Sequence, residues 1–287
     1  MTNPLLTLAS AAARWLPDFI KRGLYRLGPA TRGLRSILNR AAPRGLTEVK
    51  VSAGGLAGMR LQLDLQREKD YWLGTYELDL QQAISDWGKP GMVAYDLGAN
   101  IGYVSLLLAR TVSPGGQVIG FEALPENFER LKENLALSAL LNVRPIPQAI
   151  SDKSGVAKFL VHESGGMGKL AGSTGRDHIY RRELKVESIT LDDFVFEKSN
   201  PKPDLIKVDI EGGEALAMVG MRRVIQDCRP IFFIELHGRE AAETVWEILS
   251  NAGYSFQGMS KGYPSLKDID ELGWKGYVVA RPINETV

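Results

Sequence analysis

Two short acidic stretches carry the side chains best suited to acid–base chemistry, and each follows an apolar run. The stretch "DLIKVDIEGGE" supplies Asp209 and Glu211, and "FFIELHG" supplies Glu235 and His237. Residues two apart in a strand share one face, so Glu235 and His237 are expected side by side. Histidine ordinarily titrates near neutrality, which makes His237 the candidate general base. We therefore predict a catalytic group formed by these four residues.

The same side chains allow two other interpretations. Carboxylate oxygens and one imidazole are suitable ligands for Mg²⁺ or Mn²⁺, so Asp209, Glu235 and His237 are also a candidate metal site. Their spacing does not require a metal. Alternatively, Lys207 and Asp209 form a buried ion pair on one strand face, and His237 is an ordinary strand-end histidine.

A glycine turn in "VAYDLGANIGYVSL" is typical of nucleotide-binding α/β domains. Gly98 and Gly102 are present, but Asn100 replaces the middle glycine that lets a backbone approach a pyrophosphate. Asp96 precedes the turn, and a carboxylate there repels phosphate and attracts a cation. S-adenosylmethionine has no phosphate and carries an ammonium and a sulfonium. The charge pattern therefore favours this cofactor over NAD.

A second acidic residue supports a nucleoside ligand. The segment "QVIGFEALPENFERL" ends an apolar strand at Glu122, where a carboxylate accepts hydrogen bonds from ribose hydroxyls. One helix and one strand fit between Asp96 and Glu122, and Pro125 with Glu126 opens the next helix. The alternative is that Glu122 is simply a solvated carboxylate at a strand end.

The elements that position these residues alternate along the chain. We expect strands over 92–96, 117–121, 143–147, 204–208 and 230–236, and helices over 102–110, 125–139, 214–226 and 240–251. Such alternation predicts an α/β fold with a Rossmann-like, doubly wound, mostly parallel sheet covered on both faces. A hairpin over 47–52 and 59–64 precedes it, and a strand pair over 254–257 and 276–280 closes one edge.

One segment interrupts the alternation. Strands are expected over 157–161 and 184–189, and residues 164–182 between them are rich in glycine, serine and charge. A loop of this length in a compact domain is usually functional or disordered. A substrate lid and plain disorder are equal alternatives.

Residues 1–50 form a basic, partly helical N-terminal extension, ahead of the main domain over 51–287. Nine basic minus two acidic residues give this extension a charge of +7, and the whole-chain charge of +1 leaves −6 for the remainder. Apolar residues recur in it at roughly helical spacing: Trp15, Leu16, Phe19, Ile20, Leu24 and Leu27. The extension either packs on the main domain or rests on an anionic membrane or a partner.

Composition excludes several classes of protein. One cysteine, Cys228, rules out an intramolecular disulfide framework. We see neither an apolar run long enough to span a membrane nor a signal peptide. The acidic main domain makes nucleic acid an unlikely partner. We expect a cytoplasmic protein, either free or peripheral at the inner face of the membrane.

Six motifs in register resemble the FkbM-type methyltransferases, a branch of the class I S-adenosylmethionine-dependent enzymes. They are "YWLGTYE", "YDLGANIGYVSL", "GFEALPENFERLKENL", "SITLDDF", "DLIKVDIEGGE" and "FFIELHG", and the match covers about 69–254. The resemblance implies a seven-stranded sheet whose last strand is antiparallel. It also implies methyl transfer to a hydroxyl of a sugar, glycan, glycolipid or secondary metabolite.

The resemblance also assigns cofactor contacts. Asp96, Gly98, Asn100 and Gly102 would line the methionine part, Glu122 would bind the ribose, Ala149 and Ser151 would flank the adenine, and Glu77 is a further candidate. Two competing functions remain: a non-catalytic binding or scaffold protein of this fold, and an NAD-dependent oxidoreductase. The acceptor molecule and the oligomeric state are open.

Overall fold

The computed structural model describes residues 4–16, 39–163, 166–174, 180–272 and 275–283. The chain divides into two compact units. The first comprises Met1–Gln82 with Glu133–Ala139, and the second comprises Ala83–Lys132 with Leu140–Val287. These units do not coincide with the expected division into an extension over 1–50 and a methyltransferase domain over 51–287, which stays a prediction. Within the described ranges, every helix is too short or too polar to cross a bilayer.

The first unit contains a small hairpin and short helices. Its elements are α1 (Pro4–Trp15), β1 (Leu46–Lys50), β2 (Arg60–Asp64), α4 (Lys69–Leu73) and the start of α5 (Leu78–Trp87). The strands β1 and β2 pair antiparallel, as the alternating sequence predicts. Leu61, Leu63 and Trp72 are fully buried and form part of its core.

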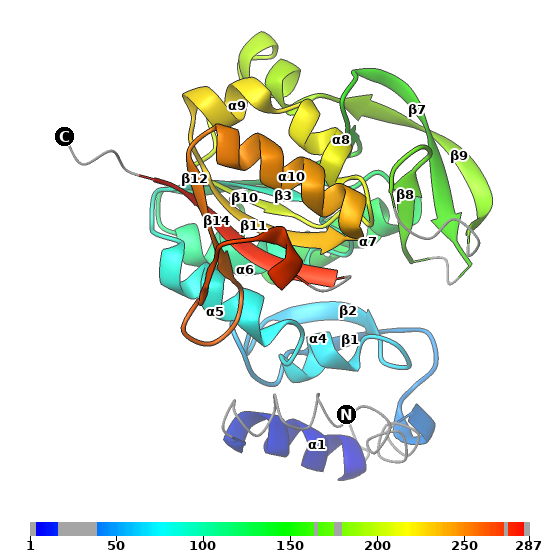
Figure 1. The fold of residues 1–287 in the computed structure, drawn as a ribbon. Helices are drawn as coiled ribbons and strands as arrows, with labels where there is room; N and C mark the ends of the chain where they lie inside the picture. Colours follow the sequence, from blue (N-terminus) through cyan, green and yellow to red (C-terminus); the bar gives the residue numbers. More distant parts are fainter. Residues whose placement is uncertain (1–3, 17–38, 164–165, 175–179, 273–274, 284–287) are drawn as a thin grey trace. The chain divides into compact units, whose positions relative to one another are not determined.

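The second unit is built on an eight-stranded mixed sheet (Figure 1). Its strands are β3 (Val93–Leu97), β4 (Gln117–Phe121), β5 (Val143–Ile146), β10 (Leu205–Val208), β11 (Ile231–His237), β12 (Tyr254–Gly258), β13 (Ser265–Leu266) and β14 (Lys275–Pro282). The order is β13-β12-β14-β11-β10-β3-β4-β5. From β5 to β11 neighbouring strands are parallel, and β14 is antiparallel to β11. The doubly wound fold is confirmed, with the two-residue β13 added to the expected seven strands.

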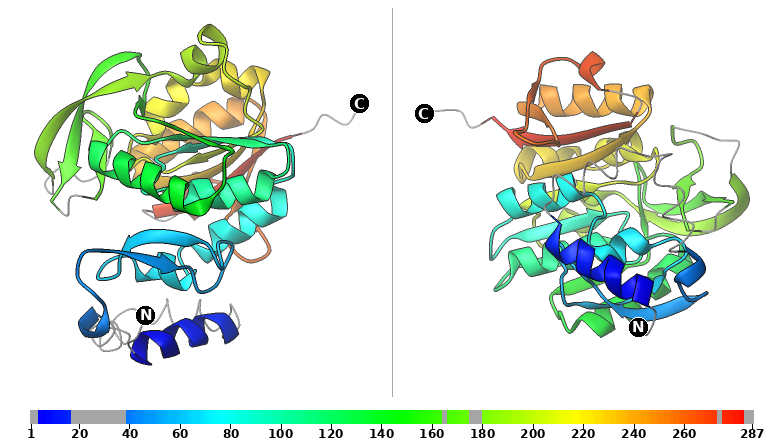
Figure 2. Two further views of the ribbon diagram at one scale, coloured as in Figure 1. Left: turned by 180° about the vertical axis from the view of Figure 1, so that it is seen from behind. Right: turned by 90° about the horizontal axis from the view of Figure 1, so that it is seen from below.

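Helices lie on both faces of this sheet. They are α6 (Tyr103–Val112), α7 (Pro125–Ser138), α8 (Glu214–Val219), α9 (Arg222–Asp227) and α10 (Arg239–Asn251), with short turns η2 (Asp193–Glu197) and η3 (Ile269–Glu271). Helices α8, α9 and α10 cover one face and α6 covers the other (Figures 1 and 2). The connections between parallel strands are right-handed. From β3 the sheet extends to β4 and β5 on one side and to β10 and β11 on the other, so the connecting helices lie on opposite faces.

The single helix expected over 214–226 is instead two helices, which corrects the sequence prediction. Asp192 accepts hydrogen bonds from the backbone N–H groups of Arg223 and Val224 at 3.0 and 2.9 Å. This remote carboxylate satisfies the free donors at the start of α9. The backbone of Gly220 also packs closely on the Ser151 carbonyl, where a Cβ atom would meet the oxygen at 2.0 Å. Both contacts are long-range, so no local pattern announces the break.

The residues that connect β5 to β10 along the chain form a second sheet, which we call the arm. It consists of β6 (Ala149–Ile150), β7 (Gly155–His162), β8 (Gly168–Leu170) and β9 (Tyr180–Ile189), in the order β6-β9-β7-β8. Strand β8 and the start of β9 lie within the segment expected to be a loop or lid, so that segment is partly a paired sheet. Residues 164–165 and 175–179 lie outside the described residues.

Candidate active site

The predicted catalytic residues, the glycine turn and Glu122 lie at the carboxyl ends of four adjacent strands, β4, β3, β10 and β11. Parallel pairing places Lys207 of β10 beside Asp96 of β3 and Phe233 of β11. Asp209 follows β10 directly, and His237 is the last residue of β11. Open α/β sheets bind ligands at this edge. The fold therefore joins the two acidic stretches and the glycine turn, which are far apart in the sequence.

The glycine turn is fixed by close backbone contacts. The N–H groups of Gly98 and Ala99 both donate to the Phe121 carbonyl, at 3.0 and 2.8 Å. Gly98 has φ 81°, and a Cβ atom there would lie 2.0 Å from the Asp209 carbonyl oxygen. Asn100 adopts φ 49°, a left-handed conformation that asparagine tolerates better than most residues. Gly102, with φ 94°, caps the N-terminus of α6.

Beneath the turn, Lys207 and Asp96 form a buried ion pair. The Asp96 side chain is fully buried and the Lys207 side chain is 4% exposed. The ammonium lies 3.2 Å from Asp96 Oδ1 and donates to the Gly98 carbonyl at 2.9 Å, while Ser105 donates to Asp96 Oδ2 at 2.6 Å. The predicted contact with Asp209 is also present, at 3.6 Å. The cation next to Asp96 is therefore Lys207, and the pair supports the cofactor turn from inside.

Glu122 is a buried carboxylate that retains hydrogen-bonding capacity. Its Oε2 accepts from the Asn100 N–H and its Oε1 from the Leu124 N–H, both at 2.8 Å. Burial raises the pKa of Glu122 to about 7, although these two donors oppose the shift. Each carboxylate oxygen has a second acceptor site. Glu122 can therefore accept the two hydroxyls of a ribose, which fits S-adenosylmethionine.

The remaining cofactor candidates occupy two places. Ala149 and Ser151 lie on and directly after β6, and both are buried. The Ser151 N–H donates to the Ile189 carbonyl at 3.1 Å, so the backbone there is held by the arm. Glu77 lies in the first unit, half-buried, immediately before α5 and with φ 43°. The roles of these three residues stay predictions.

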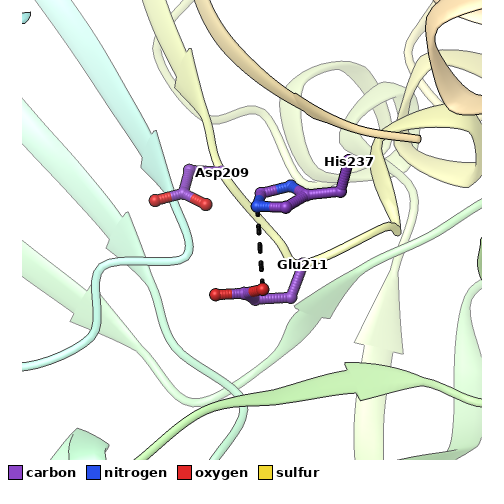
Figure 3. A group of neighbouring side chains, drawn as sticks. All are labelled: Asp209, Glu211 and His237. Carbon is purple, nitrogen blue, oxygen red and sulfur yellow. Dashed lines mark ion pairs between the residues drawn. The ribbon is translucent and has the colours of Figure 1, made fainter. Parts of the chain in front are cut away.

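His237 sits in a ring of carboxylates. Its Nδ1 lies 3.0 Å from Glu214 Oε1, and its Nε2 lies 3.0 Å from Glu235 Oε1. The same Nε2 lies 3.6 Å from Glu211 Oε2 (Figure 3). Glu214 is fully buried, and its Oε1 also accepts from the backbone N–H of Gly212 at 3.1 Å. The sequence analysis did not assign Glu214 to the site. Its place directly after the two glycines of "DIEGGE" is the signal that could have found it.

This setting changes the expected chemistry of His237. Burial alone would lower the pKa of the imidazole, but the hydrogen bonds to Glu214 and Glu235 outweigh it and raise the pKa to about 10. Burial would likewise raise the pKa of Glu235, but His237 and Lys275 hold it below its usual value. His237 is thus a cation at neutral pH. The sequence expectation that it titrates near neutrality is corrected, because neighbouring carboxylates stabilise the protonated ring.

Asp209 and Glu211 present the accessible part of the cluster. Their side chains are 19% and 35% exposed. One atom each from Asp209, Glu211 and His237 lie within 4.8 Å of one another (Figure 3). The two carboxylates and the imidazole are therefore close enough together to act on the same small polar group.

The Mg²⁺ prediction stays a prediction. Two of its three ligands, Asp209 and His237, lie within 4.8 Å of each other and of Glu211, close enough to hold one ion. Glu235, the third predicted ligand, pairs with Lys275 as well as with His237.

The arm contacts the turn that follows β10, which carries Glu211 and Gly212, through Thr174. The N–H and hydroxyl of Thr174 both donate to the Gly212 carbonyl, at 3.1 and 3.0 Å. A Cβ atom on Gly212 would meet the Thr174 carbonyl oxygen at 2.0 Å. Lys169, 1% exposed, holds this segment by donating to the carbonyls of Ser173 and Thr174 at 3.3 and 3.0 Å. The arm thereby fixes the backbone next to Glu211, a contact that sequence reasoning missed.

Comparison with known proteins shows which family the chain resembles. A family model described as "Methyltransferase FkbM domain" matches residues 96–256, which is more than half of the chain. Hexuronic acid methyltransferase AglP of Haloferax volcanii is 29% identical over 192 residues, covering 67% of this chain and 72% of that protein. The 2-O-methyltransferase NoeI of Sinorhizobium fredii is 29% identical over 166 residues, covering 53% and 66%. The 31-O-demethyl-FK506 methyltransferase FkbM of Streptomyces tacrolimicus is 25% identical over 205 residues, covering 62% and 74%.

Proposed function

Because the chain belongs to the FkbM methyltransferase family, and is therefore an S-adenosylmethionine-dependent methyltransferase, we propose that it methylates a hydroxyl oxygen of a sugar, glycan or glycolipid. The name of AglP, a hexuronic acid methyltransferase, supports a sugar acceptor, and the name of NoeI, a 2-O-methyltransferase, supports transfer to an oxygen. A hydroxylated secondary metabolite is the second candidate. It is favoured by the likeness to the FK506 methyltransferase.

The observation that carries the proposal is the close approach of the Asp209, Glu211 and His237 side chains to one another. A neutral alcohol is a poor nucleophile, so its proton must leave as the oxygen attacks. Two partly exposed carboxylates and an imidazolium around one oxygen position can bind the hydroxyl and take up that proton. S-adenosylmethionine supplies the electrophilic methyl group on its sulfonium.

Within this cluster we assign the proton to Glu211. Asp209 is paired with Lys207 at 3.6 Å and is the less exposed of the two carboxylates. Glu211 is the more exposed carboxylate, and His237 lies 3.6 Å from it. His237, held between Glu214 and Glu235, orients Glu211 and the acceptor oxygen. It does not act as the base predicted from the sequence, because its own proton is already in place.

On the cofactor side, the chain binds through the glycine turn and Glu122. The ionised Glu122 accepts from the ribose hydroxyls, and its hydrogen bond from Asn100 couples that carboxylate to the turn. Lys207 keeps the turn in position through the Gly98 carbonyl. These contacts bind and align the cofactor and take no part in proton transfer.

The test combines binding and turnover. Calorimetric titration with S-adenosylhomocysteine should show saturable binding, which Glu122→Gln weakens and Glu211→Gln leaves nearly unchanged. Transfer of labelled methyl groups to a panel of hexoses, uronic acids and oligosaccharides should then fall about 100-fold or more in Glu211→Gln. Glu129→Gln, a carboxylate on the surface of α7, is the matched control.

Three outcomes would contradict the proposal. Full turnover in Glu211→Gln would remove its assigned role. Binding of S-adenosylhomocysteine without turnover on any hydroxylated acceptor would favour the non-catalytic alternative. Saturable binding of NAD in its place would contradict the cofactor assignment.

A further inference from the structure

Helix α1 packs on the first unit through one face only. Leu6 and Ala13 on that face are 2% and 6% exposed. Between them Ser10 hydrogen-bonds to the Ser52 hydroxyl at 2.7 Å, and Arg14 donates to the Ser52 carbonyl at 3.2 Å. Positions 6, 10 and 13 follow the helical repeat, so this face and its partners fix the rotation of the helix.

The opposite face of α1 is apolar and exposed. It consists of Leu5, Leu8, Ala12 and Trp15, which we call the outer stripe. Its three large side chains are 45%, 66% and 85% exposed, in chain order. At 100° per residue, Leu8 and Trp15 lie roughly 160–180° from Leu6 around the helix. The helix therefore carries two apolar faces, of which the unit buries only one.

The outer stripe is a candidate docking surface. Helices with apolar residues all round are normally buried, and clustered exposed apolar side chains mark interaction sites. Arg14 is the only charged residue of α1, so no charged side chain within the helix interrupts the stripe. Tryptophan at the end of such a stripe is typical of helices at a membrane interface, since its ring suits the boundary between apolar and wet surroundings.

The charge of the surrounding sequence identifies the occupant. We propose that the outer stripe inserts into the surface of an anionic lipid bilayer. Residues 1–50 contain nine Lys or Arg against two acidic residues, whereas the rest of the chain is acidic. Arg40, Arg44 and Lys50 are exposed. Basic side chains flanking an apolar helix face attract anionic headgroups while the apolar side chains enter the acyl boundary.

This inference goes beyond the proposed function and does not rest on it. The charge of residues 1–50 argues against the outer stripe of a second copy as the occupant. A dimer formed through the outer stripe would bring two +7 extensions together, which like-charge repulsion opposes.

Vesicle co-sedimentation of the full chain tests the proposal. Vesicles of phosphatidylcholine mixed with phosphatidylglycerol should bind the protein, and phosphatidylcholine alone should bind it weakly. Leu8→Ser with Trp15→Ser should lower the apparent affinity at least about tenfold, and added salt should lower it in the unmodified chain. Leu141→Ser, which changes a leucine that is 98% exposed in the second unit, should leave binding unchanged.

A second readout reports insertion directly. The fluorescence of Trp15, obtained as the difference between the unmodified chain and Trp15→Phe, should shift to the blue when anionic vesicles are added. Equal vesicle binding by Leu8→Ser with Trp15→Ser and by the unmodified chain would overturn the proposal. So would a dimer in sedimentation equilibrium that this variant abolishes, because the outer stripe would then be an interface between copies. Thermal melting of the variant should match that of the unmodified chain, since both side chains are exposed.

Discussion

Replacement of Lys207 by methionine gives the sharpest test of how the strand ends are held together. Methionine approximates the length of the lysine stem but carries no charge. It would leave the fully buried carboxylate of Asp96 without its cation and the Gly98 carbonyl without its donor. Asp209 would also lose a partner at 3.6 Å. The substitution therefore removes the ion pair without creating a large cavity.

The expected effect is large because the remaining charge is buried. Removing one partner of a buried ion pair typically costs about 3–5 kcal/mol. For a unit of this size, about 1 kcal/mol lowers Tm by roughly 2–4 °C, so a fall of about 6–20 °C is expected. Affinity for S-adenosylhomocysteine should also fall, because the glycine turn loses the hydrogen bond that fixes Gly98.

Thermal melting and calorimetric titration measure the two effects. The double variant Asp96→Asn with Lys207→Met should recover part of the lost Tm, since the uncompensated carboxylate is gone. Arg239→Met breaks two exposed ion pairs, with Glu243 and Asp270, and should change stability by less than about 1 kcal/mol. A fall in Tm of less than about 2 °C in Lys207→Met, or no recovery in the double variant, would refute the reasoning.

Three further predictions concern single side chains. Between its unfolded value and about 7, folded Glu122 binds more protons than the unfolded chain, so the contribution of Glu122 to stability should decrease as pH rises from 4.5 to 7 and stay constant above it, where the raised pKa of His237 causes the further decline. Glu122→Gln should abolish this slope, worth on the order of 3 kcal/mol, in Tm measured against pH. Affinity of the unmodified chain for S-adenosylhomocysteine should decline below pH 7, because the ribose hydroxyls need the ionised carboxylate. Thr174→Val removes the hydroxyl that donates to the Gly212 carbonyl and should lower kcat about tenfold with little change in cofactor affinity. Thr174→Ser keeps a hydroxyl and should retain the kcat of the unmodified chain. Loss of cofactor affinity in Thr174→Val would mean instead that the arm supports the glycine turn. His237→Ala should lower kcat and leave S-adenosylhomocysteine binding intact, and unchanged turnover would show that Glu211 needs no orienting partner.

The main sheet could be predicted from sequence because its strands are local patterns. The strand expected over 117–121 has those bounds in the structure, and the other central strands differ by one or two residues at an end. Fully buried parallel strands are continuous apolar runs between turn residues, which a single sequence displays plainly. The glycine turn could also be predicted, because only glycine readily adopts the positive φ that the structure has at Gly98 and Gly102.

Contacts across the fold were harder to anticipate. The pairing of Lys207 with Asp96 depends on strand order, because β10 is next to β3 in space but follows it by more than 100 residues. The raised pKa of His237 depends on Glu214, which α8 brings under the ring. Strand β8 lies in a stretch whose glycine and serine content suggests a loop, and its pairing with β7 overrides that local preference.

The close approach of Gly98 to Asp209 limits which substitutions this edge of the sheet can accept. The backbones that follow β3 and β10 meet there without an intervening side chain, since a Cβ atom at position 98 would lie 2.0 Å from the Asp209 carbonyl oxygen. Any residue other than glycine would have to adopt φ 81° and would push the glycine turn away from the segment that carries Asp209. The turn and the acidic stretch are therefore coupled, so that a shift in the position of one shifts the other.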